Sequence, residues 1–148
     1  MNSQAVMSAG EGSGAKTVMS RPSVMNHEIR IMRVYEVTPE MEGYRILVDR
    51  LWPRGLKKER ITPFDWAQTA APSKALRKWF SHDPQRFAAF AERYREELNF
   101  NRNMPELAEK IKEILADQDV FLLYSAKNRE ENQAVILKEW LERMVRTK

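Results

Sequence analysis

One segment constrains the fold more than any other: the run Val120–Tyr124 is apolar at every position and rich in residues that favour strands. A strand with one solvated face alternates apolar and polar residues, whereas a strand covered on both faces is continuously apolar. We therefore expect a buried strand here. A sheet covered on both faces predicts an α/β fold, a single three-layer domain whose small central sheet is at least partly parallel and flanked by helices.

Hydrophobic periodicity predicts the remaining elements of this domain. Alternating apolar and charged residues predict a strand at Ile29–Val37, and an apolar centre at residues 46–48 predicts a second strand at Tyr44–Leu51. Thr62–Trp66 is predicted to be a short extended piece. Apolar residues spaced three to four apart predict four helices, of which the first ends at Phe80 and the second covers Pro84–Leu98. The third begins at Pro105 and the last follows Asn128. We expect Ser73 and Asn128 to act as the N-caps of the first and last helices.

The first 28 residues differ in composition from the rest of the chain. Up to Met25 they are rich in Ser, Gly, Ala and Met and show no hydrophobic period. Such a segment buries too little apolar surface to offset the entropy lost on ordering. We therefore expect a disordered N-terminal extension over residues 1–28 and one domain over residues 29–148. A functional tail is the alternative interpretation of the extension.

Composition excludes several classes of chemistry. The chain has no cysteine, so disulfides, thiolate catalysis and cysteine-ligated metals are excluded, and a cytoplasmic location is expected. With only His27 and His82, a zinc site built from histidines is not expected, and we predict no metal and no cofactor. No apolar run approaches the roughly 18 residues that would span a membrane, so we expect no membrane partner.

Functional residue types crowd the turn that follows the second predicted strand. A turn needs Pro and Gly, but it does not need Asp, Arg, Trp and Arg beside them. Arginines donate paired hydrogen bonds to phosphate or carboxylate, a tryptophan can stack on a flat ligand, and Asp49 can orient a group or transfer a proton. A structural ion pair and a core tryptophan are the alternatives. The predicted ligand-binding residues of this turn are Arg50, Trp52, Arg54 and Gly55.

A second group of candidates lies elsewhere in the chain. Lys127 and Asn132 follow the buried strand, where an anion can be held near the start of the last helix. Arg77 is a further anion-binding candidate, and His82 is a candidate for proton transfer because histidine titrates near neutral pH. His82 can equally be a structural residue of a turn. In α/β folds, sites form beyond the carboxyl ends of strands. Asp49 and Lys127 would therefore share a pocket only if their strands are parallel and near neighbours.

Three blocks of sequence carry a family resemblance. The first is Arg45–Gly55. The second is Ala71–Ser73 and Leu76–Pro84 with Arg93 and Tyr94, and the third is Leu122–Lys127 with Asn132 and Ala134–Leu137. In these blocks the chain resembles the YeaO-like family of small bacterial proteins, domain of unknown function 488. The resemblance implies a compact α/β domain and supplies no reaction. Relatives often have Asp and His where this chain has Asn128 and Glu131, so the chain departs from them there.

The residues predict a small protein with an anion-binding pocket. The leading hypothesis is an enzyme that acts on a phosphorylated or nucleotide-like small molecule, with Asp49 or His82 as the proton-transfer group. A nucleic-acid-binding or regulatory module is a weaker alternative, because the net charge of +4 comes from interspersed residues. A non-catalytic binding protein with a degenerate pocket is the third hypothesis, which Asn128 and Glu131 favour. The sequence leaves catalysis, the substrate and the oligomeric state open.

Overall fold

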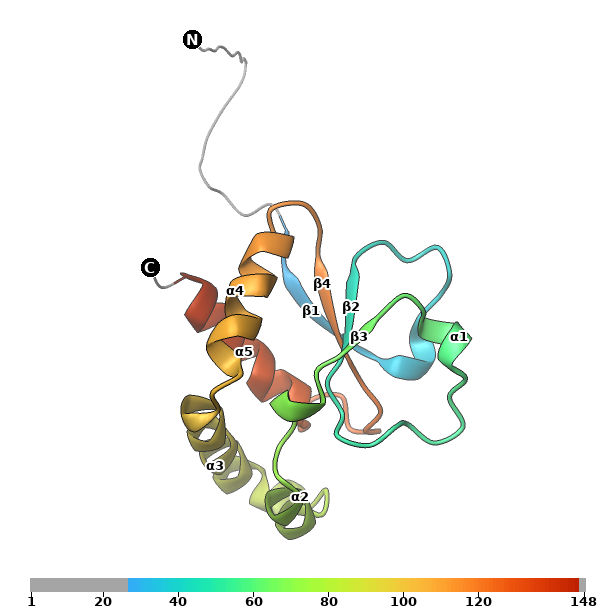
Figure 1. Cartoon of the computed structure of the whole chain (residues 1–148). Helices are drawn as coiled ribbons and strands as arrows, with labels where there is room; N and C mark the ends of the chain where they lie inside the picture. Colours follow the sequence, from blue (N-terminus) through green and yellow to red (C-terminus); the bar gives the residue numbers. More distant parts are fainter. Residues whose placement is uncertain (1–26, 147–148) are drawn as a thin grey trace.

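A four-stranded parallel sheet organises residues 27–146, the part of the chain that the computed structural model describes (Figure 1). Its strands are β1 (Ile29–Arg33), β2 (Tyr44–Leu47), β3 (Asp65–Trp66) and β4 (Val120–Tyr124). The order across the sheet is β1-β4-β2-β3, and every neighbouring pair is parallel. All five residues of β4 are buried. The structure therefore confirms the predicted α/β class, the buried strand and the parallel sheet.

Strand β4 lies between β1 and β2, so its residues have a partner on each side. Leu122, for example, pairs with Ile31 of β1 and with Ile46 of β2. Because β2 and β4 are parallel neighbours, their carboxyl ends meet at the same edge of the sheet. This is the condition under which Asp49 and Lys127 were expected to lie near one pocket.

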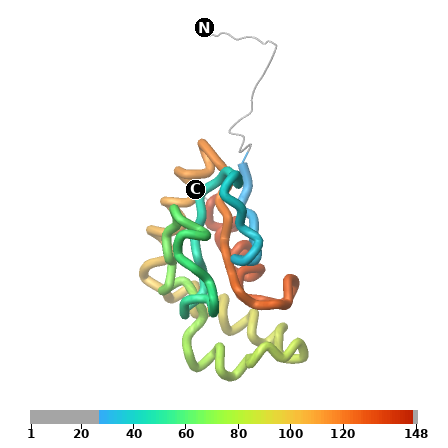
Figure 2. The backbone as a smooth tube through the Cα atoms, turned by 90° about the vertical axis from the view of Figure 1, so that its right-hand side faces the viewer, coloured from blue at the N-terminus to red at the C-terminus, as the bar shows by residue number. Residues whose placement is uncertain are grey.

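The main hydrophobic core lies between the sheet and the longer helices. Helix α5 (Gln133–Arg146) packs against β1 and β4, and α3 (Phe87–Phe100) and α4 (Met104–Ile114) pack against α5. The shorter α2 (Lys74–Phe80) packs against α3. Both views place α2 and α3 toward the end of the sheet at which the strands terminate (Figure 1 and Figure 2). One helix pair is thus positioned to border a site at the strand ends.

The opposite face of the sheet is covered by short pieces of chain. A 3-10 turn at Val34–Glu36, the helix α1 (Lys58–Ile61) and connecting loops build a second, smaller core there. Phe121 and Leu123 of β4 belong to this second core, whereas Leu122 belongs to the main core. Alternate residues of one strand therefore enter the two cores, which explains why β4 is apolar at every position.

Helix starts show where the sequence predicted capping correctly and where it did not. Ser73 Oγ accepts from the amide of Leu76 at 3.1 Å, which confirms the predicted N-cap of α2. The prediction that Asn128 caps the last helix is wrong. Helix α5 begins at Gln133 because Asn132 Oδ1 accepts the amides of Ala134 (2.8 Å) and Val135 (3.2 Å). Asn128 instead closes a turn in the preceding loop.

Two predicted strands are shorter than expected. Strand β1 stops at Arg33, which pairs with the last residue of β4, and the chain continues as the 3-10 turn. Strand β2 stops at Leu47 rather than Leu51. Beyond Val48, the amide of Ser125 donates to the side-chain carboxylate of Asp49 at 3.1 Å, so a side chain takes the place of the sheet ladder.

Most of the expected N-terminal extension, residues 1–26, lies outside the described residues. His27 and Glu28 are described and contact the domain: the amide of Glu28 donates to Asp119 Oδ1 at 2.8 Å, and the His27 ring bonds the carbonyl of Leu115 at 3.1 Å. Within residues 27–146, no helix has the length and apolar character needed to cross a membrane.

A buried arginine ties the loops of the second core to the sheet. Arg45 of β2 is only 6% exposed, on the same face of the strand as Leu47. Its guanidinium donates to four backbone carbonyls, those of Thr38, Met41, Ile61 and Thr62, at 3.1–3.2 Å. Carbonyls that lose a buried donor retain their desolvation cost without compensation.

We expect Arg45→Met to lower the free energy of unfolding by about 2–4 kcal/mol, because it removes several hydrogen bonds from a charged donor at once. Urea unfolding monitored by circular dichroism measures the change. The matched control is Arg102→Met, since Arg102 is exposed and outside both cores. Equal stability of the two variants would contradict this role of Arg45.

Candidate functional site

A hollow of about 1150 Å³ lies at the carboxyl ends of β2 and β4. Residues that follow β1, β2 and β4 line it, and α2 contributes a further wall. We call this space the cationic hollow, for the charges described below. It brings together, among others, the predicted site residues Asp49, Arg50, Trp52, Arg54, Arg77, His82 and Lys127. Asp49 and Lys127 therefore line the same pocket, a point that the sequence left open.

The carboxylate of Asp49 joins the two strand ends. Its Oδ2 accepts from the hydroxyl of Ser125 at 2.5 Å and from the Ser125 amide at 3.1 Å, and its Oδ1 accepts from Gln133 Nε2 at 2.7 Å. Ser125 follows β4, and Gln133 begins α5. Because both oxygens are occupied by neighbouring residues, Asp49 fixes the geometry at the strand ends.

Burial dominates the ionisation of Asp49. The residue is 8% exposed, and burial raises the pKa of its carboxyl above the ordinary range. The hydrogen bonds from Ser125 and Gln133 and the charge of Arg77 lower the pKa and offset part of this effect. Arg77 itself has a buried Nε with no hydrogen-bond partner among the described residues. The guanidinium therefore acts on Asp49 by charge rather than by a direct bond.

Basic side chains dominate the rest of the lining. Seven lining residues are lysine or arginine, and Asp49 is the only acidic one. Two of the seven are engaged with backbone carbonyls: Arg50 with those of Ala71 and Pro72, and Arg33 with those of Ser125 and Ala126. Of the other five, Arg77 interacts with Asp49 through its charge. The side chains of Arg54, Lys74, Lys78 and Lys127 have no hydrogen bond or ion pair with any residue in the range 27–146. The hollow therefore combines fixed cations with cations available to a ligand.

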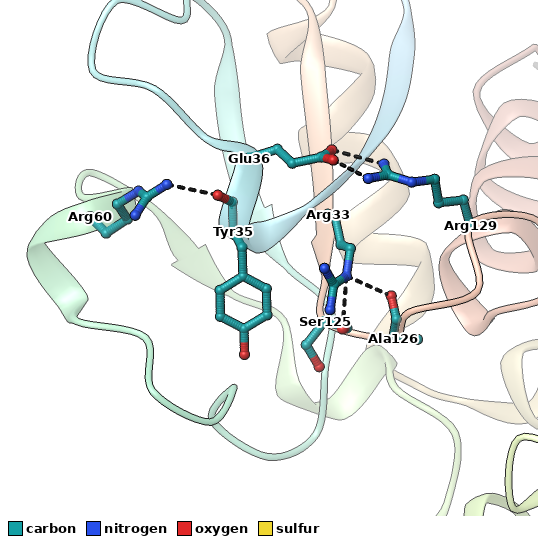
Figure 3. A network of polar contacts seen from close by, with 7 residues as sticks. All are labelled: Arg33, Tyr35, Glu36, Arg60, Ser125, Ala126 and Arg129. Carbon is teal, nitrogen blue, oxygen red and sulfur yellow. Dashed lines mark hydrogen bonds and ion pairs between the residues drawn. The ribbon is translucent and has the colours of Figure 1, made fainter.

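The loop between β4 and α5, residues 125–132, is held in place from the side of β1. Arg33 Nε donates to the carbonyls of Ser125 (3.3 Å) and Ala126 (3.0 Å), and Glu36 pairs with Arg129 through both carboxylate oxygens. Figure 3 shows these contacts reaching the loop from Arg33, the last residue of β1, and from Glu36 in the turn that follows it. Because Lys127 lies between the anchored residues, the position of its backbone is set by this network.

The other predicted site residues have distinct surroundings. The indole of Trp52 donates to the carbonyl of Leu56 at 2.8 Å, and its ring borders the hollow. His82 lies in a left-handed turn (φ 57°) after α2 and is exposed, with its ring 5.9 Å from that of Phe80. Gly55 has φ 75° and is not among the lining residues, so its contribution is a backbone conformation that favours glycine. Asn132 is 1% exposed and is occupied by capping α5.

Several lining residues were not predicted from the sequence, among them Arg33, Lys74 and Gln133. Arg33 was assigned to an alternating strand, and Lys74 resembles any charged residue in the first turn of a helix. Gln133 follows the capping residue of α5, so it becomes visible only once the helix start is known to be Asn132. Within the described part of the chain, no group of three or more His, Asp or Glu side chains is arranged to hold a metal ion.

The buried carboxyl of Asp49 predicts a particular dependence of stability on pH. Its raised pKa means that the folded protein keeps this proton to higher pH than the unfolded chain, whose aspartate titrates near about 3.9. The contribution of Asp49 to stability is therefore lost as the pH rises through the folded pKa. We therefore compare the free energies of unfolding of Asp49→Asn and the wild type. The value for Asp49→Asn minus that for the wild type should increase with pH above about 4 and then level off.

Urea unfolding in steps from acidic to neutral pH, in buffers without phosphate, measures this difference. Taking the difference between the two proteins removes the contributions of Glu36, Asp65 and Asp119, whose carboxyl pKa values are lowered. A difference that falls as the pH rises would show that the carboxyl of Asp49 has a lowered pKa in the folded protein.

Comparison with known proteins places this architecture in a family. The family model described as the inactive DUF488-N3 subclade matches residues 28–148. The uncharacterized protein YeaO of Escherichia coli is 41% identical over 113 residues, which cover 76% of this chain and 96% of that protein. The uncharacterized protein Rv3073c of Mycobacterium tuberculosis is 44% identical over 84 residues, 57% of this chain and 71% of that protein. No solved structure matches significantly. The chain belongs to the YeaO-like family of DUF488 proteins.

Proposed function

We propose that this protein binds a small anionic ligand in the cationic hollow and performs no chemistry on it. The observation that carries the proposal is the charge of the lining, where seven basic residues accompany one acidic residue. Such a concentration of like charge is unfavourable in the absence of a counter-charge, and a concave site focuses the resulting field on an anion. Arginine and lysine are the side chains that bind phosphate and carboxylate groups in proteins.

The arrangement of the four uncommitted cations supports the same function. Arg54 follows β2, Lys74 and Lys78 are on α2, and Lys127 follows β4, so the charges approach the hollow from three separate segments. A surface cluster that serves only solubility needs no such convergence. The 1150 Å³ of space is of the size of small-molecule sites, and we propose a ligand that carries phosphate or carboxylate groups.

Three observations favour binding over catalysis. Both carboxylate oxygens of Asp49 are occupied by Ser125 and Gln133, which suits a positioning role better than proton transfer. Asn128, which lines the hollow, is engaged in a turn with Glu130 and Glu131. The matching family model is itself described as an inactive subclade. We therefore propose the non-catalytic alternative in place of the enzyme hypothesis.

Isothermal titration calorimetry with inorganic pyrophosphate tests the proposal. We expect Arg54→Ala and Lys127→Ala each to weaken binding by roughly tenfold, as for the loss of one charge-assisted hydrogen bond. Saturation at about a hundred times the dissociation constant should stabilise the wild type by about 2.7 kcal/mol. The matched control is Lys112→Ala, since Lys112 is an exposed residue of α4 outside the hollow.

Equal affinity of Arg54→Ala, Lys127→Ala and the control would contradict binding in the hollow. Absence of binding to pyrophosphate, phosphate and small dicarboxylates alike would contradict the proposal as a whole. Titration with a short DNA duplex under the same conditions distinguishes the nucleic-acid alternative, whose affinity would fall steeply with added salt.

A further inference from the structure

A second hollow, of about 680 Å³, lies beside the cationic hollow, and three of its seven lining residues are aromatic. We call it the aromatic hollow and define it by Trp52, Phe64, Trp66, Asp65 and Lys58, with Thr62 and Pro63. The ring of Trp52 is 5.7 Å from that of Phe64 and 5.5 Å from that of Trp66, at interplanar angles of 49° and 69°. Trp66 remains 38% exposed although it is a large apolar side chain.

The indole nitrogens are bonded to the protein, which leaves ring surface for a ligand. Trp66 Nε1 donates to the carbonyl of Asp49 at 2.7 Å, and Trp52 Nε1 donates to the carbonyl of Leu56 at 2.8 Å. Both rings are thus oriented by bonds to fixed backbone atoms. Since their polar atoms are satisfied, their contribution to the hollow is aromatic surface, against which a planar ring can stack.

The charges around the aromatic hollow favour a neutral ring over an organic cation. Asp65 is paired with Lys110 at 2.6 Å and accepts a hydrogen bond from Tyr44, so its charge is already compensated. The ammonium of Lys58 lines the same space. The cationic hollow next to it adds seven basic residues. A cation that approached the aromatic rings would therefore be repelled, although three aromatic rings otherwise suit a cation.

Trp52 is the residue that the two hollows share. It lines the aromatic hollow together with Phe64 and Trp66, and it lines the cationic hollow together with Asp49 and Arg54. The two spaces are therefore neighbours across one indole ring. A molecule that combines an anionic group with a flat ring can contact both at once, and each part then meets the surface that suits it.

On the basis of the anion binding proposed above, we propose that the ligand carries a planar aromatic ring, as a nucleotide or an aryl phosphate does, and that this ring binds in the aromatic hollow while the anionic group binds in the cationic hollow. Stacking on aromatic side chains tolerates different bases, because every base presents a π-face. The proposal therefore assigns the chemical class of the ligand, an aromatic phosphate, rather than one base.

Comparison of phosphates with and without an aromatic ring tests this assignment. The ring-bearing probes are the four ribonucleoside 5′-monophosphates and phenyl phosphate, and ribose 5-phosphate is the reference without an aromatic ring; each is titrated by calorimetry. We expect at least one ring-bearing probe to bind more tightly than ribose 5-phosphate by roughly fivefold or more, the worth of one stacked base. Trp66→Ala should remove this advantage while the affinity for ribose 5-phosphate stays unchanged.

Two further variants separate ring contact from a general loss of structure. Phe64→Leu alters the same hollow and leaves the hydrogen bond of Trp66 in place, so it should reduce the advantage as well. Phe100→Ala is the matched control, because Phe100 is an aromatic residue, 86% exposed, outside both hollows. Circular dichroism of each variant checks that it is folded.

The outcomes distinguish the two proposals. Equal binding of ribose 5-phosphate and all ring-bearing probes would overturn the aromatic assignment and leave anion binding in place. Absence of binding to every phosphate would overturn anion binding, and with it the assignment that depends on it. A ring advantage that survives both Trp66→Ala and Phe64→Leu would place the ring elsewhere and would also overturn the assignment.

Discussion

The bond between Asp49 and Ser125 is the interaction on which the arrangement of the site depends. It joins the residue that follows β2 to the residue that follows β4, and the second oxygen of the same carboxylate holds Gln133 at the start of α5. A carboxylate that is 8% exposed has lost most of its hydration, and only well-formed hydrogen bonds offset that cost. These bonds therefore hold the ends of β2 and β4 and the start of α5 together, and the basic side chains lie around them in the cationic hollow.

The cationic hollow gathers seven basic residues around one acidic residue. Clustered positive charges repel one another, and a chain selected for stability alone would distribute them over the surface. The scaffold compensates by fixing two of the guanidiniums against backbone carbonyls, Arg50 on the segment before α2 and Arg33 on the loop after β4. The ion pair between Glu36 and Arg129 is a second contact that holds the loop after β4 in position. These contacts hold the lining in place, which suits the anion binding proposed above.

The sequence predicted the features that follow from periodicity and failed where partners are distant along the chain. Val120–Tyr124 identified the buried central strand, because only a strand between two cores is apolar throughout. The crowded turn after β2 indicated residues that line the cationic hollow, since residues beyond parallel strand ends converge. The end of β2 was misplaced because it depends on a bond from Asp49 to Ser125, 76 residues away. Asn128 and Asn132 are equally good caps in sequence, and the anchored loop decides between them.

The most direct test of the account is a map of where an anion binds. Heteronuclear NMR of isotope-labelled protein during titration with inorganic pyrophosphate identifies the residues whose backbone amide chemical shifts change. The account predicts saturable shifts concentrated in three segments, at residues 49–54, 74–78 and 125–128, which border the cationic hollow. Shifts that are scattered over exposed lysines elsewhere, such as Lys112, or that fail to saturate, would contradict it.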